Sequence, residues 1–422
     1  MLTIKIKIIE LLIGVSYQIE VRQENSYFYK LLQLIVYPMI HIMFGMVPYR
    51  AVSHKDYSLI QNTLIYGLKD RRVGYSSNVL TQDSNARQQL IQFSMNDLLL
   101  CHHKQVYIQG GSGLVLDMNR RLAINDYCAE MDDKLSYQDT ITKTTKQKVL
   151  LLKAGRINRY KNLQAGIMIN DRYATNYYHG LYEILIRLLV LEDINSLIPK
   201  DVPIIVDEAI MKIPSLKTSF TILTEKKQRP VFVIHQDERL LVGNLYCITP
   251  VNFIRHRFDN SESQAYYYLF DKEYTLKLKT ELLKYKSDKT FPKRVFITRK
   301  NTKHRNYNED EIFEVLEPLG FVKVAPEQLS FEEQMQLFNN AKYVFGGIGA
   351  AFTNLLFCSP GCVAVCLRSN TNGFLPPIFS TPACFNGCKV WYFGANNIKT
   401  GWHSDYEVDI ISFQKFINRV LQ

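Results

Sequence analysis

Three glycines that follow an apolar strand could form a phosphate-binding turn. The stretch YVFGGIGAAFTNLLFCSP, residues 343–360, leads from the strand into Gly346, Gly347 and Gly349 and then into a short helix-like segment. A helix N-terminus exposes unpaired N–H groups and a partial positive charge, which suit phosphate, and glycines let a ligand approach the backbone. A tight turn that binds nothing is the alternative.

A basic loop is expected at the same edge of the sheet. The predicted strand 294–298 is followed by Arg299, Lys300, Lys303 and Arg305. Ligands of open parallel sheets bind beyond the carboxyl ends of the strands, where both the loop and the glycine turn lie. Cationic side chains beside such a turn suit a diphosphate.

The elements that position these groups alternate between strand and helix. The four strands predicted in the second half of the chain are 294–298, 321–324, 343–345 and 362–367. Between them, one helix begins at Asn308 and ends at Gly320, and a second begins at Ser330. Glu311 and Glu333 lie three residues after the two starting residues, the spacing of a capping box. Short connections of this kind predict a parallel sheet.

The first half of the chain is also predicted to be α/β. Short strands with a glycine-rich turn are expected over 105–125, a strand over 165–169 and an amphipathic helix over 176–192, followed by two more strands. Residues 254–293 interrupt the alternation with a lysine-rich helical connector. The sequence therefore predicts two α/β halves.

Composition limits the partners. The 422 residues carry a net charge of +11, which favours a phosphate-bearing ligand or an anionic membrane surface. No zinc-finger spacing, basic zipper or RNA-binding signature indicates nucleic acid. The eight cysteines lack the paired spacing of a zinc site, and small buried residues in a reducing cytoplasm are the expected interpretation.

Two N-terminal stretches raise the question of membrane contact. Residues 1–20 place charges inside their apolar pattern, unlike a signal peptide. Residues 31–49 are more apolar but contain Pro38 and His41. A buried helix, an in-plane membrane contact and a true span all remain open, with the span the least favoured.

The segment RVFITRKNTKHRNYNEDEIFEVLEPLGFVKVAPEQLSFEEQMQLFNNAKYVFGGIGAAFTNLLFCSPG resembles glycosyltransferase family 61. The shared pattern is a strand followed by Thr-Arg-Lys, an Arg before Asn-Glu, a Gly-Phe strand, S-x-x-E-Q, and a glycine turn that ends in Asn. The resemblance covers residues 294–360 well and extends more weakly to NYYH at 176–179. The family includes bacterial capsular polysaccharide enzymes.

This resemblance implies a GT-B-like fold, two Rossmann-like domains facing a cleft. It implies an inverting transferase that holds a nucleotide-sugar donor in its C-terminal domain and needs no metal or other cofactor. The expected donor-binding residues are Arg299, Lys300, Arg305, Gly347, Gly349, Ala350, Thr353 and Asn354.

Two positions depart from the family pattern. Ile348 stands where the family has His, and Cys366 where it has an acid expected to bind ribose. Isoleucine cannot donate a hydrogen bond, and cysteine is a poor acceptor.

An inverting transfer needs a base that deprotonates the acceptor hydroxyl. His179 matches the family's His and is the expected base. Glu183, four residues on, shares its helix face and could orient the ring. Asn176 is expected to cap this helix on the acceptor side, and Asp171 and Glu183 are the reserve bases. A structural histidine at a helix start is the alternative.

The predicted organisation has four parts: an N-terminal region (1–95) with possible membrane contact, an acceptor-side α/β domain (96–255), a helical connector (256–293) and a nucleotide-sugar-binding α/β domain (294–422).

The predicted function is transfer of a sugar from a nucleotide-sugar donor to a hydroxyl of a surface polysaccharide or glycan acceptor. The expected location is the cytoplasm, with peripheral contact to the inner face of a membrane left open. A catalytically impaired nucleotide-sugar-binding subunit is the alternative, and a dinucleotide-dependent enzyme is weaker, because Phe352 replaces the third glycine of that fingerprint.

Overall fold

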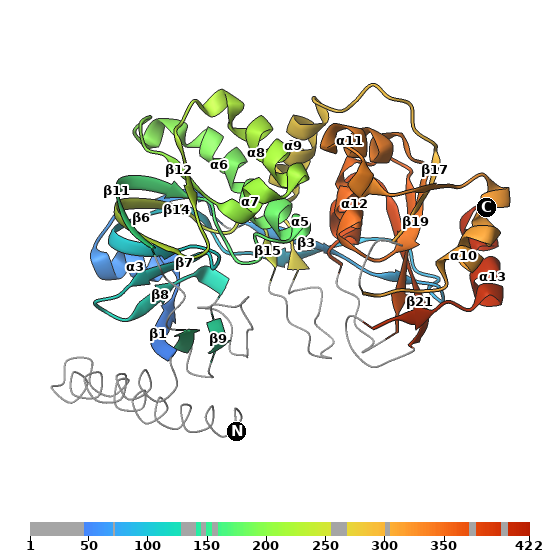
Figure 1. Cartoon of the computed structure of the whole chain (residues 1–422), viewed down its shortest axis with the longest axis horizontal. Coiled ribbons are helices and arrows are strands. Elements are labelled where there is room, and N and C mark those ends of the chain that lie inside the picture. The colour runs from blue at the N-terminus through green and yellow to red at the C-terminus, as the bar shows by residue number, and fades with distance from the viewer. Residues whose placement is uncertain are drawn as a thin grey trace, which may run out of the picture.

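The structure, a computed structural model, describes residues 46–70, 72–127, 141–144, 149–153, 159–254, 268–299, 304–370, 377–397 and 404–422. Within these ranges most strands belong to two separate sheets, one of 11 strands and one of seven, with helices packed between and around them (Figure 1). The predicted mixed α/β class is confirmed at this level.

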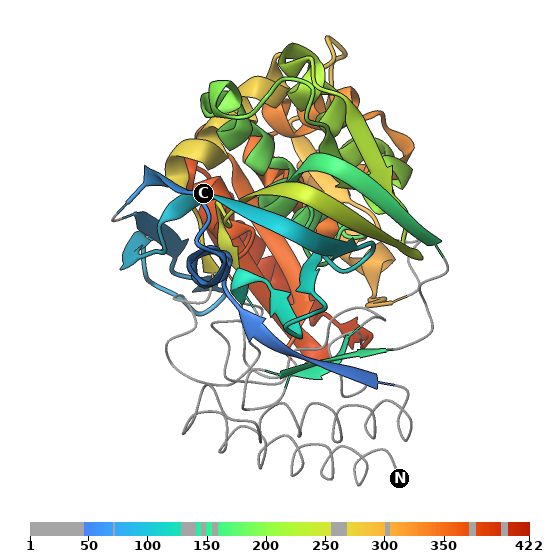
Figure 2. The ribbon, with the colours of Figure 1, turned by 90° about the vertical axis from the view of Figure 1, so that its left-hand side faces the viewer.

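The first sheet has a parallel part and an antiparallel part. Its strands, in spatial order, are β13 (Val231–Ile234), β12 (Ile204–Asp207), β11 (Arg159–Met168), β14 (Glu238–Ile248), β6 (Leu98–Gln109), β7 (Leu114–Asp117), β8 (Leu122–Ile124), β1 (Met46–Val52), β10 (Val149–Lys153) and β9 (Ile141–Thr144), with β2 (Ile65–Lys69) also on β6. The first four strands are parallel. From β14 onwards neighbouring strands are antiparallel, except that β8 and β1 are parallel. β1 lies between β8 and β10 (Figure 2).

Helices of the first half lie mainly between β11 and β14 in the chain. They are α3 (His54–Gln61), α5 (Tyr177–His179), the π-helix η1 (Gly180–Leu185), α6 (Arg187–Asp193), η2 (Asn195–Leu197), α7 (Glu208–Lys212), α8 (Pro214–Thr224), η3 (Glu225–Lys227) and, after the sheet, α9 (Lys272–Leu283).

The helix predicted over 176–192 differs from expectation in one respect. Every residue from Tyr178 to Leu191 is buried, so the element has no polar face towards solvent. It is surrounded by its own sheet on one side and by the second half of the chain on the other, and it includes a π-helical segment. A helix buried on all sides has no polar stripe towards solvent, and its polar side chains, such as His179 and Glu183, bond to one another inside the protein.

The second sheet follows the prediction closely. Its strands, in spatial order, are β18 (Val322–Val324), β17 (Arg294–Ile297), β19 (Tyr343–Gly347), β20 (Val363–Ser369), β21 (Lys389–Asn397) and β22 (Tyr406–Glu407), with β4 (Leu80–Thr81) also on β21. The first five are parallel, in the chain order 2-1-3-4-5 of a doubly wound sheet. The order reverses between β17 and β19.

Helices cover both faces of this sheet. One face carries α10 (Glu309–Leu316) with η5 (Glu317–Leu319) and α13 (Ile410–Val420); the other carries α11 (Phe331–Asn340), η7 (Ala350–Phe357) and α12 (Ser380–Phe385), and η6 (Pro326–Gln328) precedes α11. The predicted capping box of Ser330 and Glu333 is present at α11, and Gly320 adopts the expected left-handed conformation after η5. The C-terminal helix, α13, packs on this sheet, where its Phe413, Phe416 and Ile417 are buried.

The two halves share one hydrophobic core. A single cluster of buried side chains contains Leu181 and Leu216 from the first half and Leu337, Val344 and Phe352 from the second. Helix α9 lies between the halves in Figure 1. The sheets are thus separate, but the helices between them pack as one apolar layer.

Residues 46–95 are divided between the two sheets. β1 and β2 belong to the first sheet, whereas β4 adds to β21 of the second. The structure also contains two two-stranded sheets. One pairs β3 (Val73–Ser77) with β5 (Leu90–Ser94), and the other pairs β15 (Phe253–Ile254) with β16 (Tyr268–Leu269). The sequence predicted a separate N-terminal region, residues 1–95, for this part of the chain.

Most of the stretch that raised the membrane question, residues 31–45, lies outside the described residues, and residues 46–49 lie in β1. Among the described helices, none combines the length and the apolar character that crossing a membrane requires. The seven described cysteines are free thiols, and all except Cys384 are buried, as the sequence predicted.

The packing of α13 gives a stability prediction. Phe413 is fully buried and contacts Phe393 edge to face, with ring centroids 5.5 Å apart. Phe413→Ala should lower the free energy of unfolding by about 3–5 kcal/mol, measured by urea denaturation. Ile411→Ala, on the exposed side of the same helix, should change it by less than about 0.5 kcal/mol. Similar losses for both variants would contradict this packing.

Candidate active site

The glycine turn lies where the strand order of the second sheet reverses. β17 and β19 are parallel neighbours, with Ile297 opposite Gly346. Gly346 has φ +157°, and a Cβ there would lie 2.6 Å from the carbonyl oxygen of Ile297. Only glycine fits this close approach of two strands. The structure thus places the turn and the loop after β17 side by side, at the edge where doubly wound sheets bind ligands.

Arg299 lies directly over the turn. A Cβ on Gly347 would lie 2.7 Å from Cδ of Arg299, and one on Gly349 would lie 2.0 Å from its Nη1. These two glycines therefore make room for the arginine, whereas the glycine pattern predicted room for a ligand. The guanidinium is held against the backbone of the turn.

Two tyrosines close another side of the turn. Tyr307 and Tyr406 are stacked with ring centroids 5.2 Å apart. The Gly347 N–H donates to the Tyr307 hydroxyl at 3.1 Å, and the Tyr406 hydroxyl donates to the Leu367 carbonyl at 3.1 Å. The Ile348 N–H also donates to the Leu367 carbonyl, at 2.8 Å.

Arg305 joins Arg299 at this edge. It adopts φ +60°, which is uncommon for a residue other than glycine, and its Nη1 donates to the Ile348 carbonyl at 3.4 Å. Burial, together with repulsion from Arg299, lowers the pKa of Arg305. Two neighbouring guanidinium groups at a strand end give this edge a positive potential that suits an anion.

Glu309 fixes the start of the basic loop. Its carboxylate accepts hydrogen bonds from the Thr298 hydroxyl and from the Arg299 N–H, the latter at 2.8 Å. The side chain is buried although it lies in the first turn of α10. It thereby connects the end of β17, the loop and α10 beside a cavity of about 360 Å³ lined by Arg299 and residues 306–311.

The remaining predicted donor residues occupy different environments. Ala350 is exposed and opens η7, whereas Thr353 and Asn354 are buried one turn further on. The Asn354 side chain accepts from the Tyr177 hydroxyl at 2.6 Å and donates to Gln334 Oε1 at 3.0 Å. Asn354 is thus engaged between the two halves rather than at the positive edge. Lys300 lies outside the described residues.

The two departures from the family pattern have distinct places. Ile348 is half-buried and packs against the core shared by the two halves. Cys366 is fully buried within β20, where burial raises its pKa, and the strand continues to Ser369. Arg368 lies two residues further along β20, next to the last residue of the strand, and its side chain is buried.

On the acceptor side, His179 and Glu183 are brought together. Asn176 caps α5 by accepting from the Tyr178 N–H at 2.9 Å, which confirms its predicted capping role. His179 Nδ1 is hydrogen-bonded to Glu183 Oε1, and both side chains are buried. The Tyr173 ring lies against the imidazole, with centroids 4.8 Å apart.

Asp171 forms an ion pair with a buried arginine. Its carboxylate pairs with Arg187, whose guanidinium also donates to the carbonyls of Ile169 and Asn170. The other Asp171 oxygen accepts from the Arg172 N–H at 2.8 Å. A carboxylate held in this way is a weaker candidate for a base than His179.

The two candidate sites lie on elements in direct contact. Tyr177, two residues before His179, bonds Asn354 of η7, and the Tyr182 hydroxyl donates to the Thr353 carbonyl at 3.2 Å. The helix that carries the histidine is therefore hydrogen-bonded to the helix that begins at the glycine turn.

Sequence reasoning missed Glu309, Tyr307 and Tyr406. The first two lie within the stretch RNYNED, whose Asn-Glu pair was noted only as a family feature. Tyr406 is about a hundred residues away and gave no local signal. The antiparallel pairing of β22 with β21 and the hydrogen bond from the Tyr406 N–H to the Asn306 carbonyl bring it to the turn.

A doubly wound sheet with two arginines beside a strand-to-helix turn defines an α/β protein with a candidate phosphate-binding edge. Residues 177–365 match the sequence model of the family described as Glycosyltransferase 61. This match confirms the predicted resemblance to glycosyltransferase family 61 over these residues. The match includes the His179–Glu183 pair, the basic loop and the glycine turn. No curated protein matches the chain.

The buried Glu309 gives a second prediction. Glu309→Gln keeps the side-chain volume but replaces a charged acceptor that receives two hydrogen bonds. We expect the free energy of unfolding to fall by about 1.5–3 kcal/mol, measured by urea denaturation. Glu314→Gln, at an exposed position of the same helix, is the matched control and should be nearly neutral. Equal stability of both variants and the parent chain would show that Glu309 does not fix the loop.

Proposed function

We propose that the chain is an inverting glycosyltransferase that moves a sugar from a nucleotide-sugar donor to a hydroxyl of a glycan acceptor. The observation that carries this proposal is the pair Arg299 and Arg305 at the reversal point of the second sheet, within a family 61 domain. The proposed arrangement is GT-B-like, with the first sheet on the acceptor side and residues 294–422 on the donor side.

In the proposed donor site, the diphosphate lies against the two guanidinium groups and the start of η7. The N–H groups of Gly347 and Ile348 are already engaged by protein acceptors. The first N–H groups of a helix have no partner within the helix, so those of Gly349, Ala350 and Ala351 are the proposed backbone donors for phosphate, whereas the Phe352 N–H donates to the Gly349 carbonyl. Charge-assisted hydrogen bonds from arginine would stabilise the leaving diphosphate without a metal ion.

In the proposed chemical step, His179 takes the proton of the acceptor hydroxyl on its Nε2. The acceptor oxygen then attacks the anomeric carbon from the face opposite the diphosphate. The bond from that carbon to the phosphate oxygen breaks, and the nucleoside diphosphate leaves with the electron pair. Glu183, on Nδ1, holds the ring and stabilises the imidazolium that forms, as the carboxylate does in other base dyads.

The partners that follow are a nucleotide-sugar and a surface polysaccharide or other glycan. The net charge of +11 also favours contact with an anionic membrane surface from the cytoplasmic side, which remains part of the proposal. A vesicle-binding assay with and without anionic lipid tests that part separately.

A binding subunit without turnover is the second candidate, and Ile348 and Cys366 favour it. The position expected to hydrogen-bond the donor carries an aliphatic side chain, and the position expected to bind ribose is buried within β20. Nucleotide binding without sugar transfer or donor hydrolysis would support it. The dinucleotide alternative has less support, since Phe352 is buried in the shared core.

The donor site gives a third prediction. Arg299→Ala should weaken binding of a nucleoside diphosphate by roughly ten- to a hundredfold, as expected for one charge-assisted hydrogen bond, measured by calorimetry with UDP, GDP and CDP. Arg299→Lys should restore part of the affinity, because it keeps charge but not the planar fork. Lys293→Ala, just before the start of β17 and exposed, is the control. Unchanged affinity in Arg299→Ala would refute the assignment.

The proposed base gives a fourth prediction. His179→Ala should lower turnover by about 10²–10⁴-fold and leave nucleoside diphosphate affinity nearly unchanged, because the donor groups lie on the second sheet. Glu183→Gln should have a smaller effect if the carboxylate only orients the ring. Thermal unfolding of both variants checks folding, since both side chains are buried. If Glu183→Gln abolishes turnover while His179→Ala retains it, the carboxylate is the base.

A further inference from the structure

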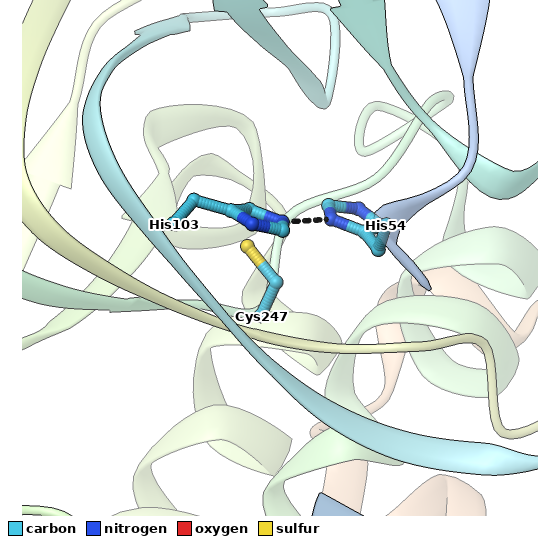
Figure 3. Close-up of side chains that lie close together, drawn as sticks. All are labelled: His54, His103 and Cys247. Atoms are coloured by element: carbon cyan, nitrogen blue, oxygen red, sulfur yellow. Dashed lines mark hydrogen bonds between the residues drawn. The ribbon is translucent and has the colours of Figure 1, made fainter. Parts of the chain in front are cut away.

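Two histidines and one cysteine meet in the interior of the first half. His54 begins α3, His103 lies in β6 and Cys247 lies in β14. Nδ1 of His54, Nε2 of His103 and Sγ of Cys247 all lie within 4.8 Å of one another. Figure 3 shows the two rings edge to edge, joined by a hydrogen bond of 2.8 Å, with the sulfur beside them. All three side chains are buried.

The donor atoms of these groups suit a metal ion. A neutral imidazole offers a lone pair on one ring nitrogen, and a thiolate sulfur is a ligand that zinc binds well. The two ring nitrogens and the sulfur face one another in the protein interior.

We propose that His54, His103 and Cys247 bind one Zn²⁺ ion through these three atoms, with water as the fourth ligand. Two imidazoles and one thiolate form a donor set that zinc prefers, and three protein ligands plus water make a common zinc geometry. The cysteine spacing alone gave no such signal, because the ligands come from three distant parts of the chain.

The proton balance of binding is simple. The thiol proton of Cys247 leaves to solvent when the thiolate binds the ion. The proton in the hydrogen bond between the two rings moves to the other nitrogen of its own ring, by exchange with solvent. Ser58 Oγ lies 3.4 Å from His103 Nδ1 and can accept the proton that this nitrogen then carries. Such outer partners orient metal-binding histidines.

An acidic neighbour and a cavity complete the surroundings. Asp126 accepts from the His54 N–H at 3.0 Å through Oδ1, and within the described part of the chain its buried Oδ2 has no hydrogen-bond partner. Asp126 and Ser53, which flank His54 in space and in sequence, respectively, also line a cavity of about 340 Å³. The bound ion would connect α3 to β6 and β14, independently of the proposed transferase chemistry.

The test is a metal analysis of the full chain purified without a histidine tag. We expect about one zinc per chain by mass spectrometry of the acid-digested protein. His103→Gln and Cys247→Ser should each remove nearly all of it, and Ser58→Ala should weaken affinity by about 10–100-fold. The controls, which should retain the ion, are His102→Gln, on the opposite face of β6, and Cys384→Ser, in the second half.

Cobalt provides a readout that does not depend on the variants folding. The parent chain, stripped of metal and titrated with Co²⁺, should show a thiolate-to-cobalt absorption of the intensity given by a single thiolate. Absence of this absorption, together with failure to bind Zn²⁺, would overturn the proposal and leave a metal-free hydrogen-bonded pair. An intensity of two or three thiolates, or zinc retained in both His103→Gln and Cys247→Ser, would place the ion elsewhere and overturn it as well.

Discussion

The side chain of Asn354 holds together the part of the molecule on which both candidate sites depend. It is fully buried, accepts from Tyr177 on the helix that carries His179 and donates to Gln334 on α11. A buried amide costs free energy unless its groups are paired, so these bonds are favourable in one relative arrangement of the three helices. The spacing between the histidine and the glycine turn is therefore set by hydrogen bonding as well as by the apolar core around it.

At the positive edge, like charges are held close to one another. Burial and, after it, repulsion from Arg299 lower the pKa of Arg305, so the folded chain keeps an unfavourable charge interaction at this place. The glycines, the tyrosine pair and Glu309 restrain Arg299 and leave it little freedom to move away. An anion that binds here gains from relief of that repulsion and loses little conformational entropy, which is how preorganised sites gain affinity.

The second sheet could be predicted from the sequence because its signals are local. The strands are short and apolar, Ser330 and Glu333 mark the start of α11, and successive strands are neighbours or near neighbours. The first sheet was harder, since β1 pairs with β8 and β10 through contacts that no local pattern encodes. For the same reason Asn354 was expected at the donor edge: its spacing in the motif is visible, but its partner Tyr177 is 177 residues away. The sequence also gave no signal for the cluster of His54, His103 and Cys247, because β6 and β14, which carry two of these residues, become neighbours only in the folded sheet.

The short strand β4 has a consequence for how the chain folds. It lies in the first hundred residues, yet it completes the edge of the second sheet by pairing with β21, and Gln88 nearby accepts from the Val390 N–H across a separation of 302 residues. During synthesis, β4 must wait for nearly the whole chain to emerge before its partner exists. Contacts of such high sequence separation slow folding, because the loop must be closed before they contribute. A C-terminal fragment expressed alone would also present β21 with unpaired backbone groups, which is an edge prone to intermolecular pairing. The two sheets are therefore distinct, but no single cut in the chain separates them. The first hundred residues supply a strand, β4, to the sheet formed by the C-terminal part of the chain.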